Sequence, residues 1–347
     1  MSIAKSARGH AATRAPRKSS MTKRMHLAGD IGGTKTLLGL FDPGGDRPRP
    51  ITVRVFGTLD YDDLSSMIAE FVDDDAVKGT SIASACFGVA GPVIDEAAEL
   101  TNVPWKVDAK RVASRFPFAR VMLLNDLQAL AYAVPVLERS EVHVLQEGTP
   151  LPHGNIAVIA AGTGLGEAML HHVNGRGYVP SPSEGGHADF PARNEREVAL
   201  LRDLITRYGR VDVERVVSGP GLVNIYRFTH GSACAASIDV TDADAPAAIS
   251  TAALERRCAD CEAAFDLFVD AYGAEAGNLA LRVVSTGGVY IGGGIAPKIL
   301  PALANGAFIR AFRAKPPLEA MLEAMPVKVI LNAKAGLLGA AVYAAST

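Results

Sequence analysis

The strongest constraint on the fold is a strand–glycine turn–strand pattern that occurs twice in the chain. The first copy is the apolar segment 26–31, the turn Gly32-Gly33-Thr34 and the apolar segment 36–41. The second copy is the apolar segment 156–160, the turn 162–166 (GTGLG) and the segment 167–172. An apolar run that is broken by glycines and resumes at once is typical of a β-hairpin. Two such units predict a duplicated architecture.

The segments around these hairpins predict an α/β fold with two lobes and a cleft between them. The first 136 residues follow the order β-β-β-α-β-α-β-α, and Pro135 interrupts the last helix. We expect a smaller α/β domain at 25–136, joined by a C-terminal helix at about 330–347, and a larger α/β domain at 137–329. The expected helices of the larger domain are 195–208, 213–217, 219–229, 245–257 and one long helix at 254–281.

Composition and charge exclude several classes of protein. Hydrophobic residues make up 48% and charged residues 21%, as in ordinary globular domains. No run of about 18 apolar residues predicts a membrane span. Residues 1–24 carry seven basic side chains and no acid, whereas the rest has 28 basic against 37 acidic side chains. An acidic body argues against nucleic acid as the partner.

The basic segment 1–24 has no apolar core, so it does not resemble a secretory signal. We expect a disordered tail or a later start at Met21 or Met25, with a transit peptide as the alternative. The four cysteines are too few for a disulfide framework in a chain of this size, which favours reduced thiols and a cytoplasmic location. Cys258 and Cys261 form a CxxC inside the expected long helix, and no second CxxC or nearby histidine completes a zinc set. We interpret them as structural thiols.

The glycine turns are candidate phosphate sites. In Asp30-Ile31-Gly32-Gly33-Thr34 the glycines allow backbone N–H groups to approach an anion, and Asp30 can hold Mg²⁺ directly or through water. The alternative is an ordinary hairpin turn. The turn 162–166 is a second candidate cradle, and neither turn matches a P-loop or a dinucleotide-binding fingerprint. The cluster 287–294 gives backbone room for a flat ring, or else marks a strand end packed tightly on a helix.

Two polar pairs are candidates for chemistry on a hydroxyl compound. Asn125 and Asp126 directly follow an apolar strand, where a carboxylate facing the cleft is a natural general base. The alternative is a helix N-cap by either residue. Glu184 and His187 flank two glycines in a loop and can hydrogen-bond several hydroxyls of a sugar, or else are unrelated surface residues.

Taken together, these motifs resemble the bacterial glucokinase family, within the hexokinase and actin-like sugar kinase superfamily. The resemblance covers about residues 25–345, in the family's order. Its segments are GDIGGT (29–34), FGVAGPV (87–93), LNDLQALAYAV (124–134), GTGLG (162–166), EGGHADF (184–190), ERVVSGPGLVNIYR (214–227), GGVYIGGGIAPK (287–298) and GLLGAAVYA (336–344).

The resemblance implies a two-lobed actin-like (ribonuclease H-like) ATPase fold and ATP-dependent phosphorylation of D-glucose at O6. It implies that Asp126 is the general base and that Asn125, Asp126, Glu184, His187 and Glu214 bind the sugar. Glu214 has no signal of its own in the sequence. The implied ATP site comprises Gly29, Asp30, Ile31, Gly32, Gly33, Thr34, Gly162, Thr163, Gly164, Gly292, Gly293 and Gly294. The resemblance also implies Mg²⁺ and a homodimer.

Two alternatives remain open: a kinase for another hexose or N-acetylhexosamine, and a non-catalytic sugar sensor. The GGTK sequence at 32–35 is common in the related ROK kinases, but those usually carry a cysteine-rich zinc cluster after their EGGH-like motif. Residues 188–198 contain no cysteine, which favours the glucokinase group. A sensor of the repressor type needs a DNA-binding module, and about 24 residues before the fold are too few for one.

Overall fold

A computed structural model describes residues 24–346 except 101–102, 104 and 232. The expected basic tail at 1–24 lies outside the described residues apart from Arg24. Among the described residues, no helix combines the length and apolar character needed to cross a membrane.

The first sheet is built on the N-terminal hairpin and has the strand order β3-β2-β1-β4-β8. β1 pairs antiparallel with β2 and parallel with β4, and β4 pairs parallel with β8. The strands are β1 (Met25–Ile31), β2 (Lys35–Asp42), β3 (Arg49–Gly57), β4 (Ile82–Val89) and β8 (Arg120–Asn125). A small antiparallel sheet that the sequence did not predict consists of β5 (Val93–Ile94), β6 (Ala97–Glu99) and β7 (Lys106–Asp108).

The second sheet repeats the pairing of the first. Its order is β12-β11-β10-β13-β14-β9, in which β10 pairs antiparallel with β11 and parallel with β13, and β13 pairs parallel with β14. The strands are β9 (Val142–Gln146), β10 (Ile156–Ala161), β11 (Leu165–Val173), β12 (Gly177–Ser183), β13 (Gly288–Gly292) and β14 (Val327–Ile330). The duplication expected from the two hairpins is therefore present as two sheets of matching topology.

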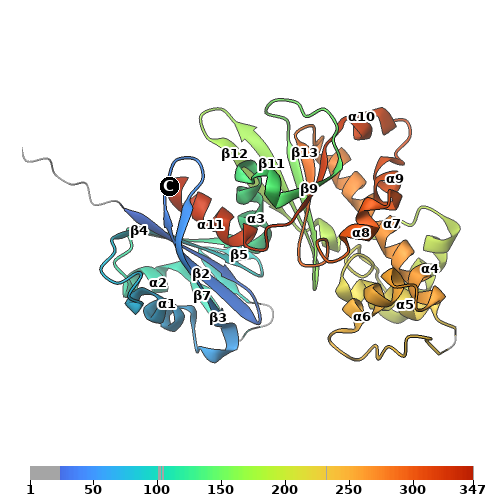
Figure 1. Cartoon of the computed structure of the whole chain (residues 1–347), viewed down its shortest axis with the longest axis horizontal. Helices are drawn as coiled ribbons and strands as arrows, with labels where there is room; N and C mark the ends of the chain where they lie inside the picture. The colour runs from blue at the N-terminus through green and yellow to red at the C-terminus, as the bar shows by residue number, and fades with distance from the viewer. Residues whose placement is uncertain (1–23, 101–102, 104, 232, 347) are drawn as a thin grey trace, which may run out of the picture.

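Helices cover both faces of each sheet, so the chain has an α/β fold with mixed sheets (Figure 1). The helices are α1 (Leu64–Asp73), α2 (Ala109–Arg115), α3 (Asp126–Ala133), α4 (Glu195–Tyr208), α5 (Gly219–Thr229), α6 (Ala245–Leu254), α7 (Ala259–Val283), α8 (Leu300–Ala304), α9 (Ala307–Arg313), α10 (Glu319–Ala324) and α11 (Ala335–Ser346).

Helices α3 and α11 pack against each other between the two sheets (Figure 1). Successive side chains of each central strand point to opposite faces of its sheet, so each sheet has one apolar face for the helix pair and one for other helices. In β1, Leu27 faces the cluster with α1, and Ala28 faces the cluster with Leu337 of α11. In β10, Ile156 packs in the cluster that contains Leu338 of α11, so adjacent leucines of one helix bury against different sheets. The helix pair α3–α11 is therefore the joint between the two halves.

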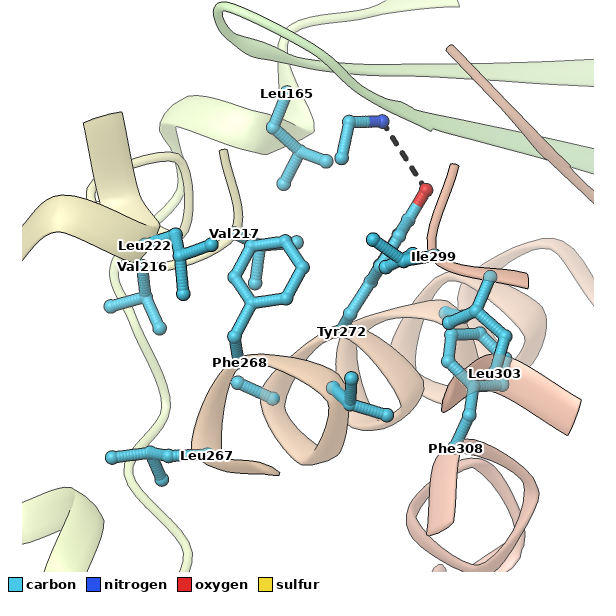
Figure 2. Packing of buried hydrophobic residues seen from close by; sticks show 14 of the residues in the cluster. Leu165, Val216, Val217, Leu222, Leu267, Phe268, Tyr272, Ile299, Leu303 and Phe308 are labelled. Atoms are coloured by element: carbon cyan, nitrogen blue, oxygen red, sulfur yellow. Dashed lines mark hydrogen bonds between the residues drawn. The ribbon is translucent and has the colours of Figure 1, made fainter. Parts of the chain in front are cut away.

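Helix α7 supports the other face of the second sheet. Tyr272 is fully buried beside Phe268 and Phe308, and its hydroxyl accepts a hydrogen bond of 3.2 Å from the backbone N–H of Ala161 (Figure 2). Ala161 is the last residue of β10, directly before the second glycine turn. The core of the second half therefore fixes the strand end from which that turn leaves.

Two helical predictions were wrong. Residues 213–217 form turns instead of a helix. The long helix expected at 254–281 is interrupted, because α6 ends at Leu254 and α7 begins at Ala259. Arg256 between them has φ of 55°, which an α-helix does not contain. Cys258 is consequently the N-cap of α7 and not a residue inside a helix.

Candidate active site

The first glycine turn connects β1 to β2 and presents Asp30 at the strand end. Gly32 donates its N–H to the carbonyl of Lys35 at 3.1 Å, which closes the turn. The hydroxyl of Thr58 donates to the carbonyl of Gly32 at 2.8 Å, and Thr58 also donates its backbone N–H to Thr34 at 3.0 Å. The turn at 32–34 is thus held from one side by Thr58, the first residue of the short 3-10 helix that follows β3.

Asp126 lies at the start of α3, directly after β8. The preceding residue, Asn125, is the N-cap: its side-chain oxygen accepts from the N–H groups of Leu127 (2.9 Å) and Gln128 (3.4 Å). The capping alternative therefore applies to Asn125. The Asp126 Oδ1 also accepts from the Leu127 N–H, at 2.8 Å. The side-chain amide of Asn125 donates to the carbonyl of Gly91 at 3.1 Å, and the Asn125 side chain also hydrogen-bonds to the carboxylate of Asp126.

The carboxylates of Asp30, Asp126 and Glu184 interact electrostatically, Asp126 with each of the other two. Burial raises the pKa of Asp30 to about 6, with a further contribution from the negative charge of Asp126 and an opposing one from Lys35. Burial likewise raises the pKa of Asp126, and the charge of Glu184 adds to it, against the hydrogen bonds from Leu127. Asp30 and Asp126 are half-buried and Glu184 is exposed, and a site that brings carboxylates together in this way is typical of catalysis or cation binding.

The second glycine turn connects β10 to β11 and is tied to Glu214. The Glu214 Oε2 accepts a hydrogen bond of 2.8 Å from the backbone N–H of Leu165, and the same carboxylate fills the space beside Gly164. The Glu214 backbone N–H donates to the carbonyl of Gly186 at 2.9 Å. Glu214 thus joins the second turn to the loop that holds Glu184 and His187. Sequence reasoning alone missed this residue, because a glutamate in a predicted helix has the pattern of a surface charge.

The loop of Glu184 and His187 packs closely on β11. A Cβ at Gly186 would overlap the carbonyl oxygen of Leu165, so glycine is required there. The His187 side chain is about half exposed, and its Nδ1 lies 3.5 Å from Asp212 Oδ2. The two glycines therefore bring the loop against the second turn while His187 extends outward.

The third glycine cluster follows β13 and lies beside the second turn. Gly293 has φ of 82°, and a Cβ on it would overlap the carbonyl of Ala161. A Cβ on Gly294, in contrast, would meet nothing within 4 Å. Gly292 lies against the side chain of Leu130 in α3. The structural alternative, a tightly packed strand end, applies to Gly292 and Gly293, whereas the backbone at Gly294 is open to approach.

A cavity of about 980 Å³ brings part of the candidate residues together. Its lining includes Gly162, Thr163 and Gly294 from the expected nucleotide side and His187 and Glu214 from the expected sugar side. Lys298 also lines it, a cation in the segment 287–298 that the sequence interpretation did not single out.

Several candidates do not line this cavity: Gly29, Asp30, Ile31, Gly32, Gly33, Thr34, Asn125, Asp126, Gly164, Glu184, Gly292 and Gly293. Asp126 nevertheless lies close to the second turn, because a Cβ on Gly166 would overlap the side chain of Leu127, the next residue. Asp30, Asp126 and Glu184 thus form an acidic group on one side of the candidate site, and the cavity lies on the other side of it.

The donor set at Asp30 fits magnesium. Its carboxylate is buried close to a second carboxylate, so a divalent cation would offset both the desolvation and the repulsion. Carboxylate oxygen is the ligand type that Mg²⁺ prefers.

The cysteine interpretation needs a correction. His230 and Cys234 lie beside Cys258 and Cys261, with all four candidate ligand atoms within 4.8 Å of one another. The sequence interpretation that no histidine lies near the CxxC was therefore wrong. The segment after α5 returns to the start of α7 and brings His230 beside the two cysteines.

Comparison with known proteins shows what the chain resembles. The family model described as Glucokinase matches residues 27–347. The chain is 42% identical over 339 residues to the protein named glucokinase of Nostoc punctiforme, covering 92% of this chain and 98% of that one. It is also similar to the crystal structure of a glucokinase from an Antarctic psychrotroph, with 29% identity, a TM-score of 0.81, and coverage of 93% and 99%. A ROK family glucokinase from Streptomyces griseus, solved with glucose and AMPPNP, shares the fold at 21% identity and a TM-score of 0.62, with coverage of 93% and 100%.

Proposed function

The chain belongs to the glucokinase family, and from this membership we propose that it transfers the γ-phosphoryl group of ATP to O6 of D-glucose. One observation carries the assignment of the reacting residue. Asp126 stands at the first turn of α3, electrostatically coupled to Asp30 of the first glycine turn, while its neighbour Leu127 packs on Gly166 of the second. A carboxylate between two equivalent turns suits proton removal from a hydroxyl that attacks a phosphate held by both.

In the proposed reaction, Asp126 accepts the proton of the O6 hydroxyl. The O6–phosphorus bond forms, the bond from the γ-phosphorus to the β,γ-bridging oxygen breaks, and ADP leaves with that bonding pair. An ordinary aspartate is ionised at pH 7. Burial and Glu184 raise the pKa of Asp126, which makes its carboxylate a stronger base than an exposed one.

The sugar would be held by side chains from the start of α3 and from the loops that follow β12. Glu184 and His187 come from the loop around the short 3-10 helix η4 (Gly185–His187) and Glu214 from the segment after it, while Asn125 contributes its side-chain amide at the start of α3. These groups supply both acceptors and donors, as a polyhydroxyl ring requires. In the proposed complex they would orient O6 toward Asp126, and orientation carries much of the rate enhancement in phosphoryl transfer.

The nucleotide would be held by backbone N–H groups of both glycine turns, with Gly292–Gly294 beside the adenine. Gly294 and Lys298 reach the same cavity as Gly162 and Thr163, which supports a nucleotide there. Asp30 would hold Mg²⁺, which when bound neutralises phosphate charge.

We assign the fold to the two-lobed actin-like ATPase class, with a smaller lobe of 25–136 plus the helix at about 330–347 and a larger lobe of 137–329. The matching pairing of the two sheets supports this, as does the packing of α11 on Ala28 and Cys86 of the first sheet. In such a fold the lobes close over the substrates and exclude water, which would otherwise accept the phosphoryl group. We further propose a cytoplasmic homodimer, and sedimentation equilibrium tests its mass.

The test is ADP release in a coupled assay with Mg-ATP and a panel of hexoses, using the wild type, Asp126→Asn and the exposed control Asp75→Asn. We expect turnover of glucose by the wild type and Asp75→Asn. Turnover by Asp126→Asn should fall at least about 100-fold with glucose binding largely kept, because the amide preserves shape but cannot accept the proton.

Three other outcomes would each remove part of the proposal. A fully active Asp126→Asn variant rules out this base. A higher kcat/KM for another hexose or an N-acetylhexosamine replaces glucose as the substrate. Sugar binding without turnover of any sugar rules out the kinase and leaves a sensor.

A further inference from the structure

Outside the proposed active site, one cluster of side chains has the composition and spacing of a metal centre. His230 Nε2 lies 3.6 Å from Cys258 Sγ and 3.8 Å from Cys261 Sγ, and Cys234 Sγ lies 3.7 Å from both sulfurs. A tetrahedral Zn²⁺ with Zn–S of about 2.3 Å and Zn–N of about 2.0 Å separates its ligand atoms by about 3.5–3.8 Å. We propose that His230, Cys234, Cys258 and Cys261 form a structural zinc site.

The histidine is already oriented as a metal ligand. Its Nδ1 lies 2.9 Å from the carbonyl oxygen of Tyr226, which can only accept, so Nδ1 carries the proton and donates it. The lone pair is then on Nε2, the atom that faces the two sulfurs. The ring of Tyr226 stacks on the imidazole with centroids 3.7 Å apart. A second partner on the distal nitrogen is the usual arrangement for a zinc-bound histidine.

The sulfurs lie where thiolates are stabilised. The Tyr226 hydroxyl and the backbone N–H groups of Ala236 and Ile238 donate hydrogen bonds to the Cys234 sulfur, which favour a thiolate there. Cys258 is the N-cap of the 25-residue helix α7, whose positive end favours an anion. The Cys261 sulfur lies within 4.8 Å of the other two sulfurs. A divalent cation resolves this crowding of three thiols.

The chemistry of the donors selects the metal and its role. Three thiolates and one imidazole in tetrahedral array suit Zn²⁺, whereas Mg²⁺ prefers oxygen. Four protein ligands leave no position for water or substrate, so the centre is structural and not catalytic. On binding, each thiol releases its proton to solvent and each sulfur donates an electron pair to the metal, giving a net charge of −1. No change of oxidation state is needed.

The site would connect the end of α5 to the start of α7 and close the intervening chain into a loop. That loop, 235–257, contains α6 and supplies one wall of the cavity opposite Gly162, Gly294 and Lys298. The loop residues lining the cavity are Val240, Asp242, Ala243, Asp244, Pro246, Ala247, Ser250, Thr251 and Leu254. A cross-link at the base of a loop lowers the entropy cost of ordering it. If the cavity takes ATP, as proposed above, zinc preorganises the nucleotide wall.

The first experiment measures metal directly, independent of activity. Untagged full chain, dialysed against EDTA, is analysed for metal by mass spectrometry, and Co²⁺ is added to chelated protein to look for the thiolate-to-cobalt charge-transfer band. We expect one zinc per chain in the wild type and in Cys86→Ala, a buried cysteine elsewhere, and loss of zinc in Cys258→Ser and His230→Gln. Substoichiometric metal in wild type grown with added zinc, together with no cobalt band, overturns the site. A protein mass lower by two hydrogens without reductant, showing a disulfide, overturns it as well.

The second experiment tests the consequence for the loop. Relative to wild type, we expect Cys258→Ser to lower the Tm by at least about 5 °C and to raise the KM for ATP about tenfold, with the KM for glucose within about twofold. Equal rises in both KM values overturn the link to the nucleotide wall. Bound zinc without kinase activity supports the metal site and rules out the proposed function. Kinase activity without bound metal supports the proposed function and rules out the metal site.

Discussion

Gly339 of α11 lies directly against the carbonyl oxygen of Ala129 in α3, so closely that a Cβ would overlap it. The two helices pack between the sheets, and α3 carries Asp126 at its start. This close contact of the helix pair therefore lies about one turn from the candidate base. A change in this contact should move Asp126 as well as loosen the core.

Gly339→Ala should destabilise the chain by about 1–3 kcal/mol, the usual cost of overpacking a core, and lower kcat by tilting α3. Thermal unfolding and steady-state kinetics measure the two effects. Ser346→Ala, on the exposed end of the same helix, is the control and should change neither. Wild-type stability and kcat in Gly339→Ala would show that the helices separate without affecting the site.

Glu184→Gln should shift the acid side of the pH profile of kcat to lower pH. The negative charge of Glu184 helps to raise the pKa of Asp126, so its removal lowers that pKa and leaves the base ionised in more acidic solution. The measurement is kcat at saturating glucose and ATP over the acid range. Asp189→Asn removes an exposed carboxylate from the same segment and should leave the profile in place. An unmoved or upward-moved acid limb in Glu184→Gln contradicts the coupling.

Asp30→Asn should stabilise the free protein near pH 8 while lowering activity. Because burial and Asp126 raise the pKa of Asp30 from 3.8 to about 6, the folded state holds a proton between these values that the unfolded state has lost. Stability of the wild type therefore falls as pH rises through this window. The asparagine variant should be more stable by about 1–3 kcal/mol above pH 6 and should match the wild type below pH 4. Denaturant unfolding at several pH values tests this, with Asp75→Asn as the exposed control; equal stability at pH 8 would contradict it.

Glu214 offers a way to separate structure from binding. Glu214→Ala leaves the Leu165 N–H without its acceptor and should cost about 1–3 kcal/mol. Glu214→Gln keeps an acceptor oxygen and should regain most of that stability, yet its KM for glucose should stay raised because a charged acceptor for a hydroxyl is lost. Denaturant unfolding and steady-state kinetics of Glu214→Ala and Glu214→Gln measure the two effects. A glutamine variant with wild-type KM would limit Glu214 to holding the turn.

Local signals were sufficient for much of the fold. Helices α4 and α5 begin and end where predicted, since Asn194 and Ser218 cap their first turns and Gly209 ends α4 with φ of 75°. The duplicated hairpins predicted both sheets, and the family predicted from the eight motifs is confirmed. The break at Arg256 was missed, because an arginine with positive φ has no marker in the sequence.

Less of the candidate site than of the fold could be predicted from the sequence. Asp30 and Asp126 could be proposed from the sequence because Asp30 lies near the end of an apolar strand and Asp126 directly follows one. Glu214 came only from the resemblance, since its role depends on a contact with a turn about 50 residues earlier. The metal cluster had a signal, His-x3-Cys at 230–234 and Cys-x2-Cys at 258–261, spacings that occur in zinc sites. The sequence interpretation missed this signal because it predicted one continuous helix and placed Cys258 inside it, whereas Cys258 lies between α6 and α7.

The position of α11 has a consequence for synthesis on the ribosome. The strands of the first sheet are translated early, but the helix that covers Ala28 and Cys86 comes last among the described elements. Until residues 335–346 leave the exit tunnel, the nascent first half exposes one apolar face of its sheet. Residues 137–334 are made during that interval, so the emerging chain presents this face to chaperones for most of its translation.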